Sequence, residues 1–508
     1  MNRVHLAALC LTLIWSPLSL TAAETNRFNL LVFITDQHHA EVLGCAGNPI
    51  VKTPNLDRLA REGTRFNRMF VPVPYCSPTR FALETGLYPS SVGLGRNIDQ
   101  NEDPLRLREP RQTYHHPLAA LGYHNHQLGK WHLGSPAELK CFPEATTDEN
   151  DFHQLMKQRR KAAGDLLFDA GPRDGETELL GDIYLTKATA EAHRQWRQEK
   201  GTPKQDVGVI GRSRLKPEFH YETVLADYCS DLIKRHQGEP FAITYSVSPP
   251  HAPWIAPAPF YDQYDPAQLP LPASWTNRPA ASAETASARM TRIYGEAGFR
   301  EYLRCYYAQV TMMDWCFGRI LKTLDELKLT DRTLIVFTSD HGNMLGQHGM
   351  MDKTLVTLYD DLMRVPFLMR LPGAIPAGKT VAGLAQTVDL PCTILDYLDA
   401  PPLTNVHGAS LRGLIEGKAD GRTAVFGERG NPDDINCGRM IRTQQWKLCL
   451  VRQNGRELYN LERDPEETRN VADDPANAEI VKTLEQQLWQ HMQEIGDPAL
   501  PLKRGNPK

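Results

Sequence analysis

The chain has 508 residues, which is long enough for one large α/β domain and a smaller one. Its 57 Lys and Arg residues against 61 Asp and Glu residues give a formal net charge of −4, and they form no basic block. Composition and charge therefore exclude nucleic acid as an expected partner.

The first 23 residues have the pattern of a cleaved signal peptide. An apolar run from about position 4 to position 20 is followed by LTAAET, whose small residues suit signal peptidase. A membrane anchor is the alternative, but His5, Trp15 and Pro17 interrupt the run, which falls short of about 20 clean apolar residues. We therefore expect export to a periplasm or the outside, without a membrane anchor.

Nine of the ten cysteines lie after this segment. An odd number in an oxidising compartment indicates that one thiol has a separate fate. No CxxC pair or zinc-type spacing is present, so a structural metal made from cysteines is not expected. Spacing alone does not show which of the other cysteines form disulfides.

Four apolar runs of strand length each end in a polar cluster. They are FNLLVFIT before Asp36-Gln37, YHNHQLG before Lys130-Trp131-His132, PFAITYSVS before Pro249-Pro250-His251, and TLIVFTS before Asp340-His341. Such continuous runs, with segments between them long enough for crossover helices, are typical of buried parallel strands. We predict an α/β fold with a large mixed or parallel sheet flanked by helices. All four clusters fall at the carboxyl ends of strands, where ligands bind in such sheets.

The remaining segments predict helices, a loop and a second subdomain. Residues 53–66 have amphipathic spacing with a Thr-Pro start and a stop at Gly63. Residues 145–235 are charged and helix-like, whereas the proline-rich and aromatic residues 249–279 favour an irregular loop over a cleft. Short strand-like pieces and a helix at about 476–494 follow residue 400. We assign residues 24–400 to a catalytic domain and residues 401–508 to a C-terminal α+β subdomain with a small antiparallel sheet and terminal helix.

Two of the strand-end clusters together suit a metal ion. Asp36 and Asp340 supply carboxylates, Gln37 an amide oxygen and His341 an imidazole. A mainly oxygen set of this kind suits a hard cation such as calcium or magnesium. Each aspartate alone would be an ordinary cap or turn residue, so this prediction depends on the pair.

Cys76 opens the stretch CSPTRFALETGLYP and does not suit this metal, because thiolates prefer softer ions. One interpretation is a small buried hydrophobic side chain, with Pro78 in the first turn of a helix. Another is a catalytic thiolate stabilised by the helix N-terminus. The residues alone leave both interpretations open.

The sequence CSPTR resembles the Cys-x-Pro-x-Arg signature of the type I, formylglycine-dependent sulfatases of the alkaline-phosphatase-like superfamily. TPNLDRLAREGTRF, TGLYP, LGKWHLG, PHAP, TSDHGNMLGQHG and ELYNLERDPEETRNVA also resemble signatures of this family, in the family's order, over residues 28 to 475. The resemblance implies an alkaline-phosphatase-like fold. It also implies that a maturation enzyme oxidises Cys76 to Cα-formylglycine, which would replace the thiol by oxygen ligands.

The resemblance further implies roles for individual residues. Position 76 would join Asp36, Gln37, Asp340 and His341 around a calcium ion, and its hydrate would attack the sulfate sulfur. Arg80 would anchor position 76. His251 would protonate the leaving oxygen, and His348 would support the site. The remaining cations would hold the sulfate and the hydroxyls of the nucleophile: Lys130, His132 and Lys353.

We therefore expect an exported sulfatase that hydrolyses a sulfate ester, most plausibly of a carbohydrate, to alcohol and inorganic sulfate. Asp36-Gln37 matches a branch that includes choline sulfatases and phosphonate monoester hydrolases, where an arginine often replaces His39. A phosphodiesterase or phosphonate monoester hydrolase with the same site is therefore an alternative. Two others are an inactive relative that binds sulfated glycans and a thiol enzyme with unmodified Cys76. Candidate substrate contacts are His38, His39, Trp254 and Asn436; oligomeric state is not readable.

Overall fold

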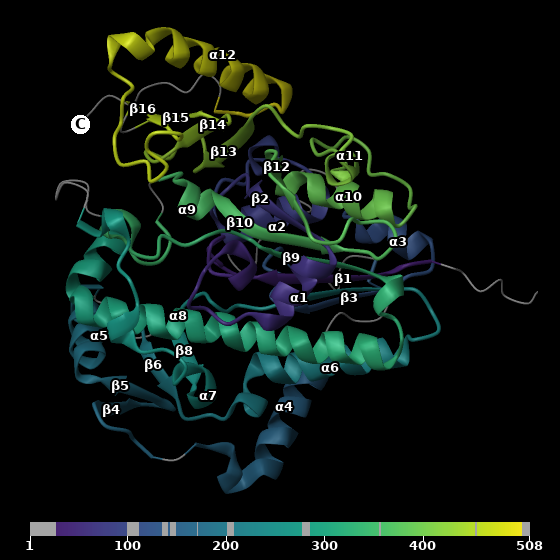
Figure 1. Ribbon diagram of the computed structural model, residues 1–508, viewed down its shortest axis with the longest axis vertical. Coiled ribbons are helices and arrows are strands. Elements are labelled where there is room, and N and C mark those ends of the chain that lie inside the picture. The colour runs from purple at the N-terminus through teal and green to yellow at the C-terminus, as the bar shows by residue number, and fades with distance from the viewer. Residues whose placement is uncertain are drawn as a thin grey trace, which may run out of the picture.

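The computed structural model describes residues 27–98, 111–134, 141–142, 149–169, 171–200, 208–276, 285–354, 357–452 and 455–499. The predicted signal peptide lies outside the described residues. The predicted fold class is confirmed, because a large mixed sheet lies between layers of helices (Figure 1).

The large sheet has the strand order β11-β2-β10-β9-β1-β7-β3, and β12 also pairs with β2. Its strands are β1 (Asn29–Thr35), β2 (Thr64–Phe70), β3 (His124–Gly129), β7 (Phe241–Ser246), β9 (Thr333–Ser339), β10 (Arg364–Arg370), β11 (Lys379–Val381) and β12 (Ala385–Gln386). The four apolar runs of the sequence form β1, β3, β7 and β9, which run parallel to one another. β10 is antiparallel to β2 and β9.

Both faces of this sheet are covered, which explains the continuous apolar runs. In β1, Leu31 and Phe33 belong to one core, whereas Leu30 and Val32 belong to the other. The first core includes α1 (Pro54–Glu62), α6 (Tyr221–Arg235) and the long α8 (Ala286–Glu326). The second includes α2 (Cys76–Thr85), α3 (His115–Ala120), α10 (Leu390–Tyr397) and α11 (Arg412–Glu416). The sheet is therefore the middle layer of three (Figure 1).

A second sheet was not predicted from the sequence. It has the order β4 (Glu176–Leu180), β5 (Ile183–Thr186), β6 (Ile210–Ser213) and β8 (Trp254–Pro257). α4 (Glu149–Ala163), α5 (Lys187–Lys200) and α7 (Ala258–Tyr261) belong to the same segments. The irregular loop predicted for residues 249–279 is therefore only partly correct, because β8 pairs in parallel with β6.

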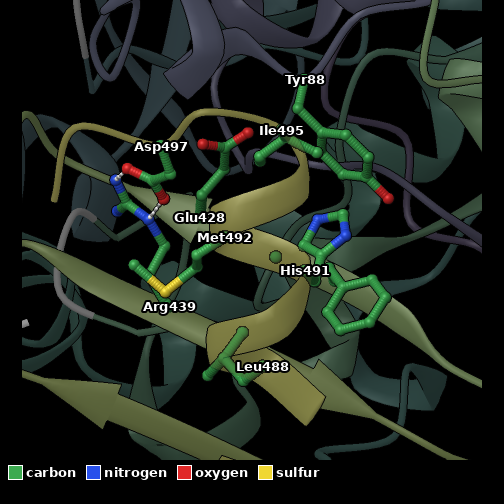
Figure 2. A pocket seen from close by; sticks show the side chains of 10 residues that line it. Tyr88, Glu428, Arg439, Leu488, His491, Met492, Ile495 and Asp497 are labelled. Carbon is green, nitrogen blue, oxygen red and sulfur yellow. Dashed lines mark hydrogen bonds and ion pairs between the residues drawn. The ribbon is translucent and has the colours of Figure 1, made fainter. Parts of the chain in front are cut away.

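The C-terminal part contains a small antiparallel sheet and a terminal helix. Its strands β13 (Val425–Arg429), β14 (Gly438–Arg442), β15 (Trp446–Val451) and β16 (Gly455–Asn460) pair in sequence order. α12 (Ala478–Glu494) packs on them, and the short α9 (Asp360–Met363) precedes β10. Asp497, just after α12, pairs with Arg439 of β14, and His491 of α12 stacks on Phe426 of β13 (Figure 2). The domain boundary placed at residue 400 stays a prediction.

Among the described residues, no helix is long and apolar enough to cross a membrane. The nine cysteines of the described part are all free thiols, and seven of them are buried. Six of the buried ones, all except Cys76, therefore need no chemical role, because a buried free cysteine behaves as a small apolar side chain. Cys76 differs from them by its polar surroundings.

Candidate active site

Two neighbouring strands bring the predicted metal ligands together. β1 and β9 are parallel with Thr35 opposite Ser339, so Asp36 and Asp340 leave the sheet side by side. The Gln37 N–H donates to Asp340 Oδ1 at 3.0 Å. Ligand atoms of Asp36, Cys76, Asp340 and His341 all lie within 4.8 Å of one another, and all four residues are buried.

Gln37, next to Asp36 in the chain, is a further candidate for this group through its side-chain oxygen. Its backbone is left-handed, with φ of 65°, which is uncommon outside glycine and marks functional sites. Its Nε2 donates to Asp352 Oδ1 at 2.5 Å, which orients the amide. Its Oε1 is buried without a hydrogen-bond partner. A buried acceptor left unpaired needs an explanation, and a bound cation provides one.

His341 also presents a free ligand atom. Its Nδ1–H donates to the Gly342 carbonyl oxygen at 2.9 Å, so the Nε2 lone pair is left for a ligand. That Nε2 lies 3.6 Å from Asp36 Oδ1 and 3.8 Å from Asp340 Oδ1. The full donor set is mainly oxygen, which suits a hard divalent cation.

The pKa values of the two buried carboxylates shift in opposite directions without such a cation. Burial raises the pKa of Asp36, but Lys130, His251 and Lys353 outweigh burial and hold this pKa well below its usual range. The pKa of Asp340 is raised, because burial and the Asp36 charge together exceed the effect of Arg80. A divalent cation between them would remove their mutual repulsion.

Cys76 is the first residue of α2 and is 1% exposed. Its Sγ lies 3.4 Å from Lys353 Nζ, 3.4 Å from His341 Nε2 and 3.7 Å from Asp36 Oδ1. Burial and Asp36 raise the pKa of the thiol, but cations led by Lys353 outweigh them and bring it well below its usual value. The surroundings of position 76 therefore stabilise negative charge.

Arg80 connects four elements of the site. It lies one turn after Cys76 in α2, and its Nε donates to Asp340 Oδ2 at 2.9 Å. One terminal nitrogen donates to the Lys130 carbonyl oxygen at 2.8 Å and to Ser246 Oγ at 2.7 Å. The other lies 3.6 Å from Asp36 Oδ2. This fork fixes α2 against the ends of β1, β3, β7 and β9.

Three further predicted residues lie at the same site. Lys130 Nζ contacts Asp36 Oδ2, and Lys353 Nζ lies 2.9 Å from His251 Nε2. His251 Nδ1–H donates to the Ala252 carbonyl oxygen at 2.8 Å, so Nε2 is the nitrogen that faces Lys353. His132 has a left-handed backbone, and its buried Nδ1 has no hydrogen-bond partner among the described residues. His348 instead stacks on Tyr359, with ring centroids 4.0 Å apart.

Two of the candidate substrate contacts are wrong. Trp254 is fully buried and packs edge-on against Tyr302, and His38 is 1% exposed with its Nε2 3.0 Å from the Val42 carbonyl oxygen. His39 is also buried, and its Nε2 lies 3.0 Å from Asp361 Oδ1.

Asn436 lines a hollow of about 470 Å³ beside Cys76. The hollow adjoins the site because Tyr75 belongs to its lining and because Asn97 Oδ1 accepts the Ser77 N–H at 3.0 Å. Its other lining residues include Arg96, Gly430 and Asp434. The cavity under α12 is separate, since apolar side chains and the Arg439–Asp497 pair surround it (Figure 2).

Sequence reasoning missed three supporting residues. Asp352 orients the Gln37 amide, and Ser246 accepts from Arg80. The Tyr306 hydroxyl donates to the Gln37 carbonyl oxygen at 2.6 Å and accepts the His39 N–H at 2.9 Å. Asp352 directly precedes Lys353, and Ser246 ends the strand before Pro249-Pro250-His251, so both could have been found beside predicted site residues. Tyr306 lies within α8 and carries no local signal.

The sulfatase family model matches residues 29–400, well over half of the chain. The chain belongs to the sulfatase family. The model of the C-terminal region of N-sulphoglucosamine sulphohydrolase matches residues 346–494. Membership makes this protein a sulfuric ester hydrolase. It agrees with a site in which cations, carboxylates and an imidazole surround Cys76.

Individual relatives are similar over nearly their full lengths. The arylsulfatase of Clostridium perfringens is 26% identical over 485 residues, which cover 92% of this chain and 94% of the relative. The N-acetylglucosamine-6-O-sulfatase of Bacteroides thetaiotaomicron is 26% identical over 515 residues, which cover 93% of this chain and 88% of the relative. The solved structure of the phosphonate monoester hydrolase of Silicibacter pomeroyi has a TM-score of 0.72 at 23% identity. The match covers 94% of this chain and 97% of that structure. At that identity the structural match shows a shared fold.

Proposed function

We propose that this sulfatase is exported and removes sulfate from a carbohydrate sulfate ester, using calcium and a formylglycine made from Cys76. The observation that carries the proposal is the position of Cys76 itself. Its side chain lies between the metal-ligand group and the cation Lys353, at the start of a helix. A nucleophile placed there would face an anionic ester held by positive charge.

Calcium would be held by Asp36, Gln37, Asp340, His341 and position 76. The fit rests on the unpaired Gln37 Oε1 and on the excess of oxygen donors. Bound there, the ion would supply positive charge to the sulfate oxygens and to the nucleophile. A thiol is the one ligand that does not suit it, which supports oxidation of position 76 by a maturation enzyme. Formylglycine would supply an oxygen nucleophile in the thiol's place.

The protein's own side chains would bind the sulfate and move the proton. Lys130, Lys353 and His132 would hold the sulfate oxygens as the sulfur–oxygen ester bond breaks. Negative charge then develops on the leaving oxygen, and His251 Nε2 would donate a proton to it. The hydrogen bond from Nδ1 to the Ala252 carbonyl oxygen keeps Nε2 directed toward Lys353 and the reacting centre.

A carbohydrate is supported by the hollow and by one relative. Asn97, Asn436 and Arg96 offer polar groups in a volume that suits a small ligand. The Bacteroides thetaiotaomicron relative is described as an N-acetylglucosamine-6-O-sulfatase. Export is supported by residues 1–23 alone. Hydrolysis of a phosphonate monoester or phosphodiester is the second candidate, supported by the Silicibacter pomeroyi structure.

Two measurements on protein from its own host test the proposal. Mass spectrometry of the tryptic peptide with position 76 should show the aldehyde, and sulfate release should vanish after chelation and return with calcium. Cys76→Ala is the matched inactive control. Unmodified cysteine in active enzyme, with inhibition by alkylating agents and no effect of chelators, would favour the thiol enzyme instead.

Substrate class is tested by comparing kcat/KM for an aryl sulfate with kcat/KM for an aryl phosphodiester. A strong preference for the diester would replace the sulfatase proposal by the second candidate. If the parent and Cys76→Ala both bind a sulfated glycan equally and neither releases sulfate, the protein is a binding relative.

A further inference from the structure

A second group of metal-binding side chains lies at the opposite end of the sheet from Cys76. Ligand atoms of His124, His236 and Glu239 all lie within 4.8 Å of one another. His124 begins β3, whereas the catalytic Lys130 follows the end of that strand. His236 directly follows α6, and Glu239 lies in the turn before β7. The group therefore joins two elements at the edge remote from catalysis.

The distances within this group are close to those around a single zinc ion. His124 Nε2 lies 2.8 Å from Glu239 Oε2, and His236 Nδ1 lies 3.8 Å from the same oxygen. Ligands at about 2.0 Å from a tetrahedral zinc are roughly 3.3 Å apart, between the two observed values. Glu239 is exposed and free to adjust by this amount, because its side chain is 61% accessible.

The main chain holds the three residues in place. The His124 N–H donates to the Pro240 carbonyl oxygen at 2.9 Å, and the Glu239 N–H donates to the His236 carbonyl oxygen at 3.0 Å. The His124 and His236 rings stack with centroids 4.2 Å apart. The backbone is therefore in place before any metal arrives, which lowers the cost of binding. The stacked rings do not yet point at one position, so the His124 ring, which is 27% accessible, has to turn out of the stack when the ion binds.

A fourth histidine completes the arrangement. His126 is buried, and its Nε2 lies 3.3 Å from His236 Nε2. If His236 binds a metal through Nδ1, its Nε2–H has His126 Nε2 as an acceptor. Metal-bound histidines usually donate their second N–H in this way, which fixes the tautomer and raises the basicity of the ligand.

We propose that His124, His236 and Glu239 bind a zinc ion, with His126 as the supporting acceptor. Two imidazoles and one carboxylate suit zinc better than calcium or magnesium, which prefer oxygen ligands. The fourth position faces solvent beside Glu239 and would hold water. The ion joins the start of β3 to the α6–β7 turn. The inference is independent of the proposed substrate and of the chemistry at Cys76.

The test measures zinc bound by the full chain without an affinity tag, by equilibrium dialysis and elemental analysis. The background carries Cys76→Ala and Asp340→Asn, which removes two of the catalytic ligands and weakens zinc binding at that site. We expect one zinc per chain. Adding Glu239→Gln or His124→Gln should lower the affinity at least about tenfold, and His126→Phe should lower it about 10–100-fold.

Glu479→Gln is the matched control, because Glu479 is an exposed carboxylate on α12. It should leave zinc binding unchanged. Glu239→Gln alone, with Cys76 and Asp340 intact, should keep full sulfatase activity and the parent's melting temperature in EDTA. The proposal is overturned if the background binds no zinc, or if Glu239→Gln and His124→Gln bind it as tightly as the background does.

Discussion

At the scale of single residues, the metal ligands depend on partners that do not touch the metal. Asp352 accepts from Gln37 Nε2 and so fixes the orientation of the amide, which leaves Oε1 unpaired for a metal. We expect Asp352→Ala to lower calcium affinity about 10–100-fold, as loss of such supporting groups does elsewhere. Isothermal titration with calcium, together with the calcium dependence of sulfate release, measures this change.

Asp352→Asn is the matched control for that variant. Asp352 has a left-handed backbone with φ of 69°, which asparagine tolerates, and the asparagine amide oxygen still accepts from Gln37. Calcium affinity should therefore stay close to that of the parent. Equal losses in the alanine and asparagine variants would show that the negative charge matters and that the orientation of the amide does not.

His251 is predicted to act on the leaving group. Its Nε2 lies 2.9 Å from Lys353 Nζ, at the reacting centre. We expect His251→Gln to lower kcat about 10²–10⁴-fold for a sugar sulfate, whose alkoxide needs a proton. For a nitrophenyl sulfate, whose phenolate leaves without one, the loss should be much smaller. An equal loss with both substrates would contradict a role in protonation.

At the scale of elements, the C-terminal sheet supports the segment that carries Lys353. Lys447 of β15 is fully buried between Asp360 of α9, at 2.8 Å, and Glu467, at 2.7 Å. α9 follows the segment that contains Lys353. Lys447 pairs with the largely buried Asp360, which Arg442 also contacts, and with the buried Glu467, so ion pairs join the C-terminal sheet to the catalytic layer.

We expect Lys447→Met to destabilise the protein by up to about 3–5 kcal/mol, because it removes the cation between two buried carboxyl groups and leaves Asp360 with Arg442. Urea unfolding measures the change. Lys482→Met is the control, since Lys482 pairs with Glu479 on the surface of α12 and such pairs are worth only about 0–1 kcal/mol. A similar small effect for both variants would show that Asp360 and Glu467 are neutral when Lys447 is absent.

Elements were predictable from the sequence where burial is complete. β1, β7 and β9 are covered on both faces, so each leaves an uninterrupted apolar run, whereas the edge strand β3 reads HNHQLG and was found from the cluster that follows it. β4 reads ETELL with alternate residues exposed, and β6 and β8 are four residues each. Such short or half-exposed strands depend on partners far along the chain, which local patterns do not reveal.

The residues of the candidate site were also predictable only where a local sequence pattern marks them. Asp36, Lys130 and Asp340 were found because strand ends place them, and Cys76 because its motif is distinctive. Trp254 was misassigned, since sequence does not say which face of β8 meets α8. Tyr306 escaped notice because its contact with Gln37 joins residues far apart in the chain.

At the scale of the whole molecule, α12 brings together residues that lie far apart in the chain. His491 of α12 stacks on Phe426 with centroids 3.7 Å apart and contacts Tyr88 edge-on at 4.6 Å (Figure 2). Burial lowers the pKa of His491 to about 3, and His407 and Arg422 add to the effect. The folded state therefore holds this imidazole neutral, whereas the unfolded chain protonates it near pH 6.5.

This difference makes stability dependent on pH with a fixed sign. A base whose folded pKa is depressed stabilises the fold fully above its unfolded pKa, and the contribution is lost as pH falls toward the folded value. The free energy of unfolding should therefore fall, because of His491, as the pH is lowered from about 6.5 to about 3. At pH 5 the loss is about 2 kcal/mol, because each pH unit below 6.5 costs about 1.4 kcal/mol.

His491→Phe tests the effect without removing the stacked ring. The His491 Nε2 has no hydrogen-bond partner among the described residues, so phenylalanine loses no such bond there. Urea unfolding at pH 7.5 should show parent and variant within about 1.5 kcal/mol of each other. At pH 5 the free energy of unfolding of the variant, taken relative to that of the parent, should be about 2 kcal/mol higher than at pH 7.5. A gap between the two proteins that is the same at both pH values would mean that His491 is protonated in the folded state as readily as in the unfolded chain.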